Sequence, residues 1–104
     1  MYTVKNCLKR DGRIVKFDRN RIQNAIIKAF AESNEGNYDI AKKVTESIIE
    51  RIVSHYAETL PNVEQIQDLV EDTLMNLKFR QTAKRYILYR EMRNRERDNI
   101  LIFN

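Results

Sequence analysis

Apolar residues recur every three or four positions in four stretches of the chain, the pattern of amphipathic helices with one buried face. The first stretch carries Ile22, Ile26 and Phe30, and Asp18 stands where a helix N-cap is expected. Turn-forming residues, including Pro61, interrupt the pattern between stretches. The spacing therefore predicts four helices, over residues of about 19–33, 38–56, 63–77 and 79–98.

The chain before the first helix has a different pattern. Two short stretches with β-branched residues, 3–8 and 13–17, flank a turn that reads Lys9-Arg10-Asp11-Gly12, and Asp-Gly is a strong signal for a hairpin turn. We therefore expect a β-hairpin over residues 3–17. With the four helices, this predicts a mainly α (α+β) fold, in which a four-helix bundle is capped by a short N-terminal β-hairpin or small sheet.

The third helix has further signals at both its start and its surface. Asn62 and Gln65 have the spacing of a capping box. The acidic side chains of this helix are expected to face water; they are Glu64, Asp68, Glu71 and Asp72.

The final residues, 99–104, include the apolar run Ile100-Leu101-Ile102-Phe103. Such a run is unfavourable for a free, solvated terminus. The sequence leaves open a tail that forms a strand on the core, a contact between chains, or the start of a linker to a following domain.

Composition narrows the class of protein. A chain of 104 residues fits one domain, and no apolar run approaches the ~20 residues that a membrane-spanning helix needs. We expect a soluble, cytoplasmic protein. Cys7 and His55 are the only residues of their types, so an internal disulfide, a four-ligand zinc site and Cys/His catalysis are excluded. An enzyme is the least expected class.

Charge is distributed unevenly along the chain. Residues 1–21 carry a net charge of +5, residues 22–77 carry −6, and residues 78–104 carry +5. Two basic ends could converge on one anionic ligand if the fold brings them together. Charge alone favours the alternative, two solvated basic faces.

The basic hairpin turn is the motif with the clearest chemistry, because cations beside accessible backbone N–H groups suit a polyphosphate. It is not a Walker A loop, and no Rossmann glycine pattern is present. The segment from Lys9 to Ile22 resembles the ATP-cone family, and the resemblance continues in residues 61–71 and 83–90. It implies a small helical domain with a short sheet, which binds ATP or dATP as an allosteric effector of ribonucleotide reductase.

The resemblance also implies which side chains contact the phosphates. Lys9 and Arg10 match the phosphate-contacting pair of the family, and Arg21 matches a basic residue that reaches phosphate or ribose from the first helix. Arg93 lies near the other phosphate-binding basic position, on the last helix.

A second group of residues corresponds to the base-binding part of the family's site. Asp18 occupies a position that hydrogen-bonds the adenine edge, and its carboxylate can accept from the N6 amine. Cys7, Ile22 and Ile26 would form an apolar wall against the base. On residue patterns alone, Asp18 is first a helix cap, and the two isoleucines are first core residues.

The implied ligand is ATP or dATP, with Mg²⁺ bound through the phosphates. The implied partner is a reductase catalytic domain, in the same chain or another, with contacts between copies of the chain. The sequence of residues 65–71 and 86–90 most resembles that of anaerobic, class III ribonucleoside-triphosphate reductases.

Three other hypotheses about the function were considered. A basic isoelectric point of about 9.3 and the Arg-rich residues 80–97 suit a nucleic-acid-binding module. A transcriptional repressor of the same family carries a zinc ribbon, which Cys7 alone cannot make. The domain could also serve only in oligomerisation, through the last helix and the residues after it.

Overall fold

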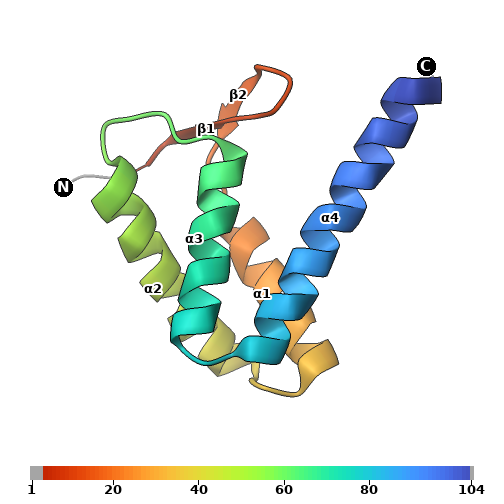
Figure 1. Cartoon of the computed structure of the whole chain (residues 1–104). Helices are drawn as coiled ribbons and strands as arrows, with labels where there is room; N and C mark the ends of the chain where they lie inside the picture. The colour runs from red at the N-terminus through yellow and green to blue at the C-terminus, as the bar shows by residue number, and fades with distance from the viewer. Residues whose placement is uncertain (1–3, 104) are drawn as a thin grey trace.

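A computed structural model describes the backbone of residues 4–103 and the side chains of residues 4–96. Two short strands precede four helices (Figure 1). The elements are β1 (Asn6–Leu8), β2 (Ile14–Lys16), α1 (Arg19–Ser33), α2 (Tyr38–Tyr56), α3 (Val63–Asn76) and α4 (Arg80–Phe103). The predicted mainly α fold with a small N-terminal sheet is confirmed.

The two strands pair antiparallel, with Cys7 opposite Val15. They are shorter than the stretches 3–8 and 13–17, and Thr3 lies outside the described residues. Gly12 has a φ of +89°, which a residue without a side chain adopts at least cost. The N–H of Leu8 donates to the carbonyl of Pro61 at 2.9 Å, so the hairpin is attached to the start of α3.

Side-chain caps begin three of the helices. Asp18 accepts a hydrogen bond from the N–H of Asn20, and Asn37 accepts one from the N–H of Ile40. At α3 the capping box is complete, because Asn62 and Gln65 each accept a hydrogen bond from the other's backbone N–H. Local sequence signals therefore determine where α1, α2 and α3 start.

The helices form a ring of neighbours around one core. Helix α1 packs against α2 and α4, and α3 packs against the same two helices. The centre holds side chains from all four helices and the hairpin, and its largest fully buried members are Phe30, Ile26, Ile48, Ile52, Leu74 and Val70. Phe30 of α1 meets Phe79 edge to face, with ring centroids 5.0 Å apart.

Helix α4 is longer than the sequence pattern predicted. It continues to Phe103, so the expected end near residue 98 is replaced by unbroken helix. A strand over residues 100–103 is wrong, because no Gly or Pro interrupts residues 80–103 and the helical hydrogen-bond ladder can run on. The C-terminal half of α4 leans away from α3 (Figure 1). Asn104 lies outside the described residues.

Within residues 4–103, no helix combines the length and the apolar composition needed to cross a bilayer.

Candidate functional site

The hairpin turn and the first turn of α1 bring basic side chains toward Cys7. Burial raises the pKa of the Cys7 thiol, and the positive charges of Lys9 and Arg21 partly oppose this rise. Both cations therefore lie close enough to the sulfur to act on it electrostatically. The raised pKa keeps the thiol neutral at physiological pH, so Cys7 acts as a small apolar side chain.

The predicted apolar wall is part of the hydrophobic core. Ile26 has no exposed surface, whereas Cys7 and Ile22 keep 8% and 7% of theirs. All three belong to one packed cluster. Cys7 and Ile22 thus keep a little exposed surface, whereas Ile26 is fully enclosed in the core.

Asp18 is exposed and caps α1. Its Oδ1 accepts from the N–H of Asn20 at 3.0 Å. This bond holds the carboxylate at the start of α1, where the helix dipole favours a negative charge. The capping role expected from the sequence is present, and the bond engages Oδ1 alone.

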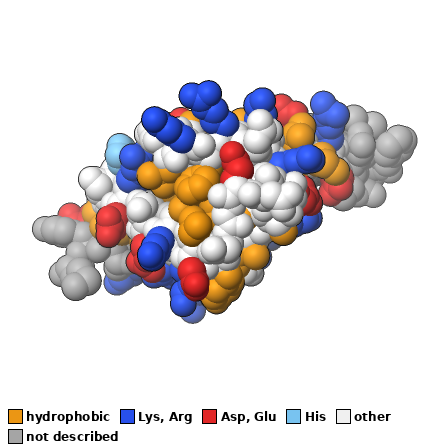
Figure 2. All heavy atoms as spheres, turned by 90° about the horizontal axis from the view of Figure 1, so that it is seen from below, with side chains coloured by type: hydrophobic (Ala, Val, Ile, Leu, Met, Phe, Trp, Pro, Cys, Tyr) orange, Lys and Arg blue, Asp and Glu red, His pale blue; other side chains and the backbone are white. Residues whose placement is uncertain are grey.

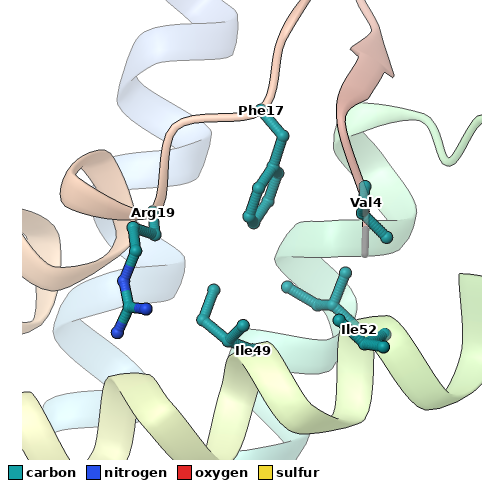
Figure 3. Close-up of a pocket in the computed structure, with 6 residues that line it drawn as sticks. Val4, Phe17, Arg19, Ile49 and Ile52 are labelled. Carbon is teal, nitrogen blue, oxygen red and sulfur yellow. The ribbon is translucent and has the colours of Figure 1, made fainter. Parts of the chain in front are cut away.

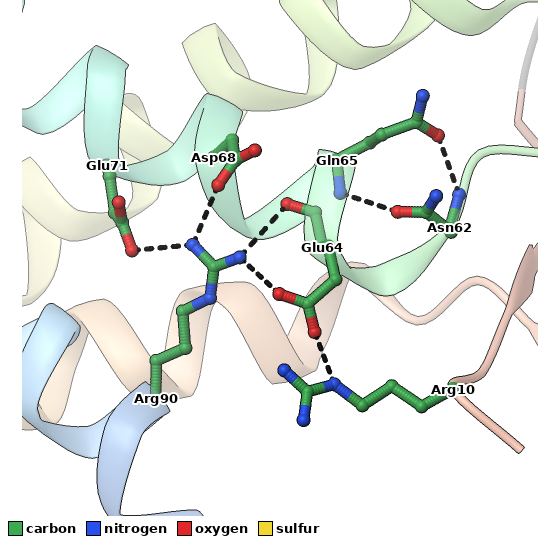
Figure 4. Close-up of polar contacts among 7 residues, drawn as sticks. All are labelled: Arg10, Asn62, Glu64, Gln65, Asp68, Glu71 and Arg90. Atoms are coloured by element: carbon green, nitrogen blue, oxygen red, sulfur yellow. Dashed lines mark hydrogen bonds and ion pairs between the residues drawn. The ribbon is translucent and has the colours of Figure 1, made fainter. Parts of the chain in front are cut away.

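Arg10 reaches from the hairpin turn to the first turn of α3. Its Nε donates to Oε1 of Glu64 at 2.6 Å (Figure 4). The two residues are 54 positions apart in the sequence. The hairpin is therefore tied to α3 by an ion pair in addition to the backbone bond from Leu8.

Arg90 of α4 lies at the centre of the same polar network (Figure 4). Its guanidinium donates to carboxylates of Glu64 at 2.5 Å, Asp68 at 2.8 Å and Glu71 at 2.8 Å. The Arg90 side chain is only 15% exposed. Hydrogen bonds from Arg10 and Arg90 lower the pKa of Glu64 despite its partial burial, so this carboxylate is ionised at neutral pH.

The expectation that the acids of α3 face water is wrong for Glu64 and Glu71, which are partly buried, whereas Asp68 is exposed as expected. All three form ion pairs because α4 packs alongside α3 and presents Arg90 to them. Asp72 is exposed, as expected. The sequence does contain a signal for the cluster: the three acids recur at i, i+4 and i+7, which places them on one stripe of the helix.

Arg93 lies one helical turn beyond Arg90 on α4 and is exposed. Its charge acts on the buried phenol of Tyr86, whose pKa burial raises to about 12. Among the described side chains, no hydrogen bond or ion pair joins Arg93 to the hairpin. The charges of Lys9 and Arg21 thus act on Cys7, and Arg10 is linked to α3, while Arg93 lies on α4.

A hollow of about 250 Å³ lies on another side of the hairpin (Figure 3). Its lining is apolar except for Arg19, which forms an ion pair with Glu46. The lining residues are Val4, Phe17, Arg19, Ile49, Ile52 and Val53. None of them is a predicted nucleotide contact, so this hollow is separate from the site predicted at the turn.

Two further observations concern nucleic-acid binding and metal binding. The described side chains on the face of the bundle opposite the hairpin are a mixture of basic, acidic and apolar groups (Figure 2). They form no continuous positive surface of the kind that nucleic acid requires. Within the part of the chain that is described, no group of three or more His, Cys, Asp or Glu residues is placed to hold a metal ion.

Comparison with known proteins gives a family match and several relatives. Residues 5–95 match the family model described as ATP cone domain. The chain is 39% identical to a vitamin B12-dependent ribonucleoside-diphosphate reductase of Thermoplasma acidophilum over 91% of its length. It is 37% identical to a ribonucleoside-diphosphate reductase subunit alpha of Chlamydia pneumoniae over 88%.

An anaerobic ribonucleoside-triphosphate reductase of Haemophilus influenzae is 32% identical over 88% of the chain. The chain spans only 13%, 10% and 13% of these three relatives, respectively. The relatives thus include the anaerobic type that residues 65–71 and 86–90 suggested, together with two other types of reductase.

Proposed function

The chain belongs to the ATP-cone family, and from this premise we propose that it binds ATP and dATP at the hairpin turn as allosteric effectors of a ribonucleotide reductase. The domain performs no chemistry of its own. The reductase to which it responds supplies the catalytic domain, in the same chain or as a partner.

The observation that carries the proposal is the grouping of three cations around the turn. Lys9 and Arg21 act together on Cys7, and neither forms an ion pair with a described residue. Arg10 is the neighbour of Lys9 in the same turn. The cations Lys9 and Arg21, which have no ion-pair partner among the described residues, suit the phosphates of a nucleotide, with Mg²⁺ held through phosphate oxygens and water.

The adenine base would lie against the edge of the core next to these cations. Cys7 and Ile22 offer apolar surface there, with Ile26 behind them. Asp18 can accept from the adenine N6 amine while its Oδ1 retains the bond to Asn20. Arg93 would complete the phosphate contacts from α4.

Calorimetric titration of the chain with ATP, dATP and GTP, each with Mg²⁺ at physiological salt, tests this function. We expect adenine nucleotides to bind with a Kd of about 1 µM, equivalent to about −8 kcal/mol, and GTP to bind much more weakly. The titration also counts the sites per domain. Absence of adenine-nucleotide binding would overturn the proposal.

Regulation requires that a nucleotide bind one state of the protein better than another. We propose that ATP and dATP differ in this respect, and that the difference is expressed as a change of assembly between copies of the chain. Sedimentation with ATP and with dATP tests this part separately, and identical profiles would argue against it.

A further inference from the structure

The ion pair between Arg10 and Glu64 joins the proposed phosphate site to the first turn of α3. We propose that Glu64 competes with the phosphates of a bound nucleotide for the guanidinium of Arg10, so that a phosphate that binds the Nε edge of Arg10 must displace this carboxylate. The inference rests on the proposed function and adds a residue that sets the affinity of the site.

Glu64 occupies one donor edge of the Arg10 guanidinium. A guanidinium binds phosphate most strongly through two parallel N–H donors. In the structure, the Nε–H of Arg10 donates to Oε1 of Glu64 at 2.6 Å, and this N–H belongs to one of the two donor pairs of the guanidinium. A phosphate that takes this edge of Arg10 must replace the carboxylate, because both groups cannot accept the same proton at full strength.

The ion-pair network around Arg10 has more negative than positive charges. The network contains two cations, Arg10 and Arg90, and three carboxylates, on Glu64, Asp68 and Glu71. Its net charge is −1. A triphosphate that approaches Arg10 therefore meets an excess of negative charge on α3, and the Glu64 carboxylate is the member in direct contact with Arg10.

Arg90 is a second cationic partner of Glu64. Oε2 of Glu64 accepts from Nη2 of Arg90 while Oε1 accepts from Arg10. When Arg10 turns to phosphate, Glu64 can keep its bond to Arg90. Exchange at the hairpin thus leaves no unpaired charge, and it changes the electrostatic link between α3 and α4.

The test compares Glu64→Gln with Asp68→Asn. Glutamine retains an oxygen that accepts from Arg10 but removes the charge, whereas Asp68→Asn neutralises an acid of the same network that contacts only Arg90. We expect Glu64→Gln to tighten binding of magnesium ATP, and of magnesium tripolyphosphate, by about two- to fivefold. Asp68→Asn should change either affinity by less than about twofold.

A double variant shows whether the gain passes through Arg10. In the Arg10→Ala background, Glu64→Gln should not increase the affinity for ATP further, because the guanidinium for which Glu64 and phosphate compete is absent. An equal gain in that background would indicate a general charge effect and overturn the inference. Weaker binding by Glu64→Gln would also overturn it and assign Glu64 the role of holding Arg10 in place.

The closing experiment separates the two proposals. A wild-type chain that binds no adenine nucleotide overturns the proposed function. A wild-type chain that binds ATP, with Glu64→Gln unchanged, overturns only the role of Glu64. Thermal unfolding of each variant checks its fold, and Glu64→Asp, which shortens the side chain but keeps the charge, is the substitute if Glu64→Gln unfolds.

Discussion

Glu35, in the loop between α1 and α2, caps the start of α4 through Thr82. Its Oε1 accepts from the backbone N–H of Thr82 at 2.6 Å and from the hydroxyl at 2.8 Å. Burial raises the pKa of Glu35, and these hydrogen bonds outweigh it, so the pKa is lowered overall. A residue 47 positions away thus supplies the cap that the sequence around α4 lacks.

Replacement of Glu35 by alanine should destabilise the fold. We expect a loss of about 1–2 kcal/mol in the free energy of unfolding, because the first turn of α4 loses its acceptor. Urea denaturation measures the loss. Glu50→Ala, at an exposed position of α2, is the control and should change stability by less than about 0.5 kcal/mol. Equal effects of the two variants would contradict the capping role.

Alanine at Lys9 or Arg10 should weaken ATP binding without unfolding the domain. Loss of a charge-assisted contact costs about 1.5–3 kcal/mol, or roughly ten- to a hundredfold in Kd. Calorimetry gives the affinities and circular dichroism verifies the fold. The matched control is Arg13→Ala, since Arg13 is a nearby basic residue outside the predicted phosphate contacts and its partner is Asp11 of the same turn. Unchanged affinity in both test variants would rule out the turn as the phosphate site.

Replacement of Arg90 by methionine should destabilise the packing of α4 on α3. Methionine retains much of the apolar stem but leaves three carboxylates without their shared cation. We expect a loss of about 1–3 kcal/mol, below the cost of breaking a fully buried pair because Asp68 is exposed. Added salt should recover part of it by screening the acids. Lys84→Met, at an exposed position of α4, is the control, and equal losses would argue against the network.

Stability should fall in acid because of Glu64 and Glu35. The pKa of each is lowered below the ordinary value of 4.5. Their stabilising contribution is therefore complete above the unfolded value and is lost as the pH falls through the lower folded value. Denaturation at about pH 7 and about pH 3 measures the loss. In Glu64→Gln the loss should be smaller, and an identical loss would show that Glu64 does not contribute.

Alanine at Gly36 should disturb the contact between two rings. A Cβ at Gly36 would lie 2.6 Å from the ring of Phe30, which packs edge to face on Phe79. Because the ring must shift, we expect a cost of about 1–3 kcal/mol in urea denaturation. In a Phe30→Leu background the same change should cost less. An undiminished cost there would place its origin in the backbone.

Most of the secondary structure could be predicted from the sequence because its signals are local. The caps at Asp18 and Asn62 and the Asp-Gly turn each act within a few residues. The end of α4 could not be predicted, since the apolar run 100–103 is compatible with both strand and helix. The family's base-binding and phosphate-binding positions were inferred from a resemblance, and their roles stay predictions until ligand binding is measured.

The sequence by itself determined the four helices, the hairpin, and the presence of Lys9 and Arg10 at its turn, because spacing and turn chemistry depend on near neighbours. The tertiary structure alone decided that Arg10 meets Glu64, that Arg90 joins three acids of α3, and that Glu35 caps α4. These pairs are separated by 19 to 54 positions. Their side chains meet only after the core has packed the helices in one arrangement, which no local pattern specifies.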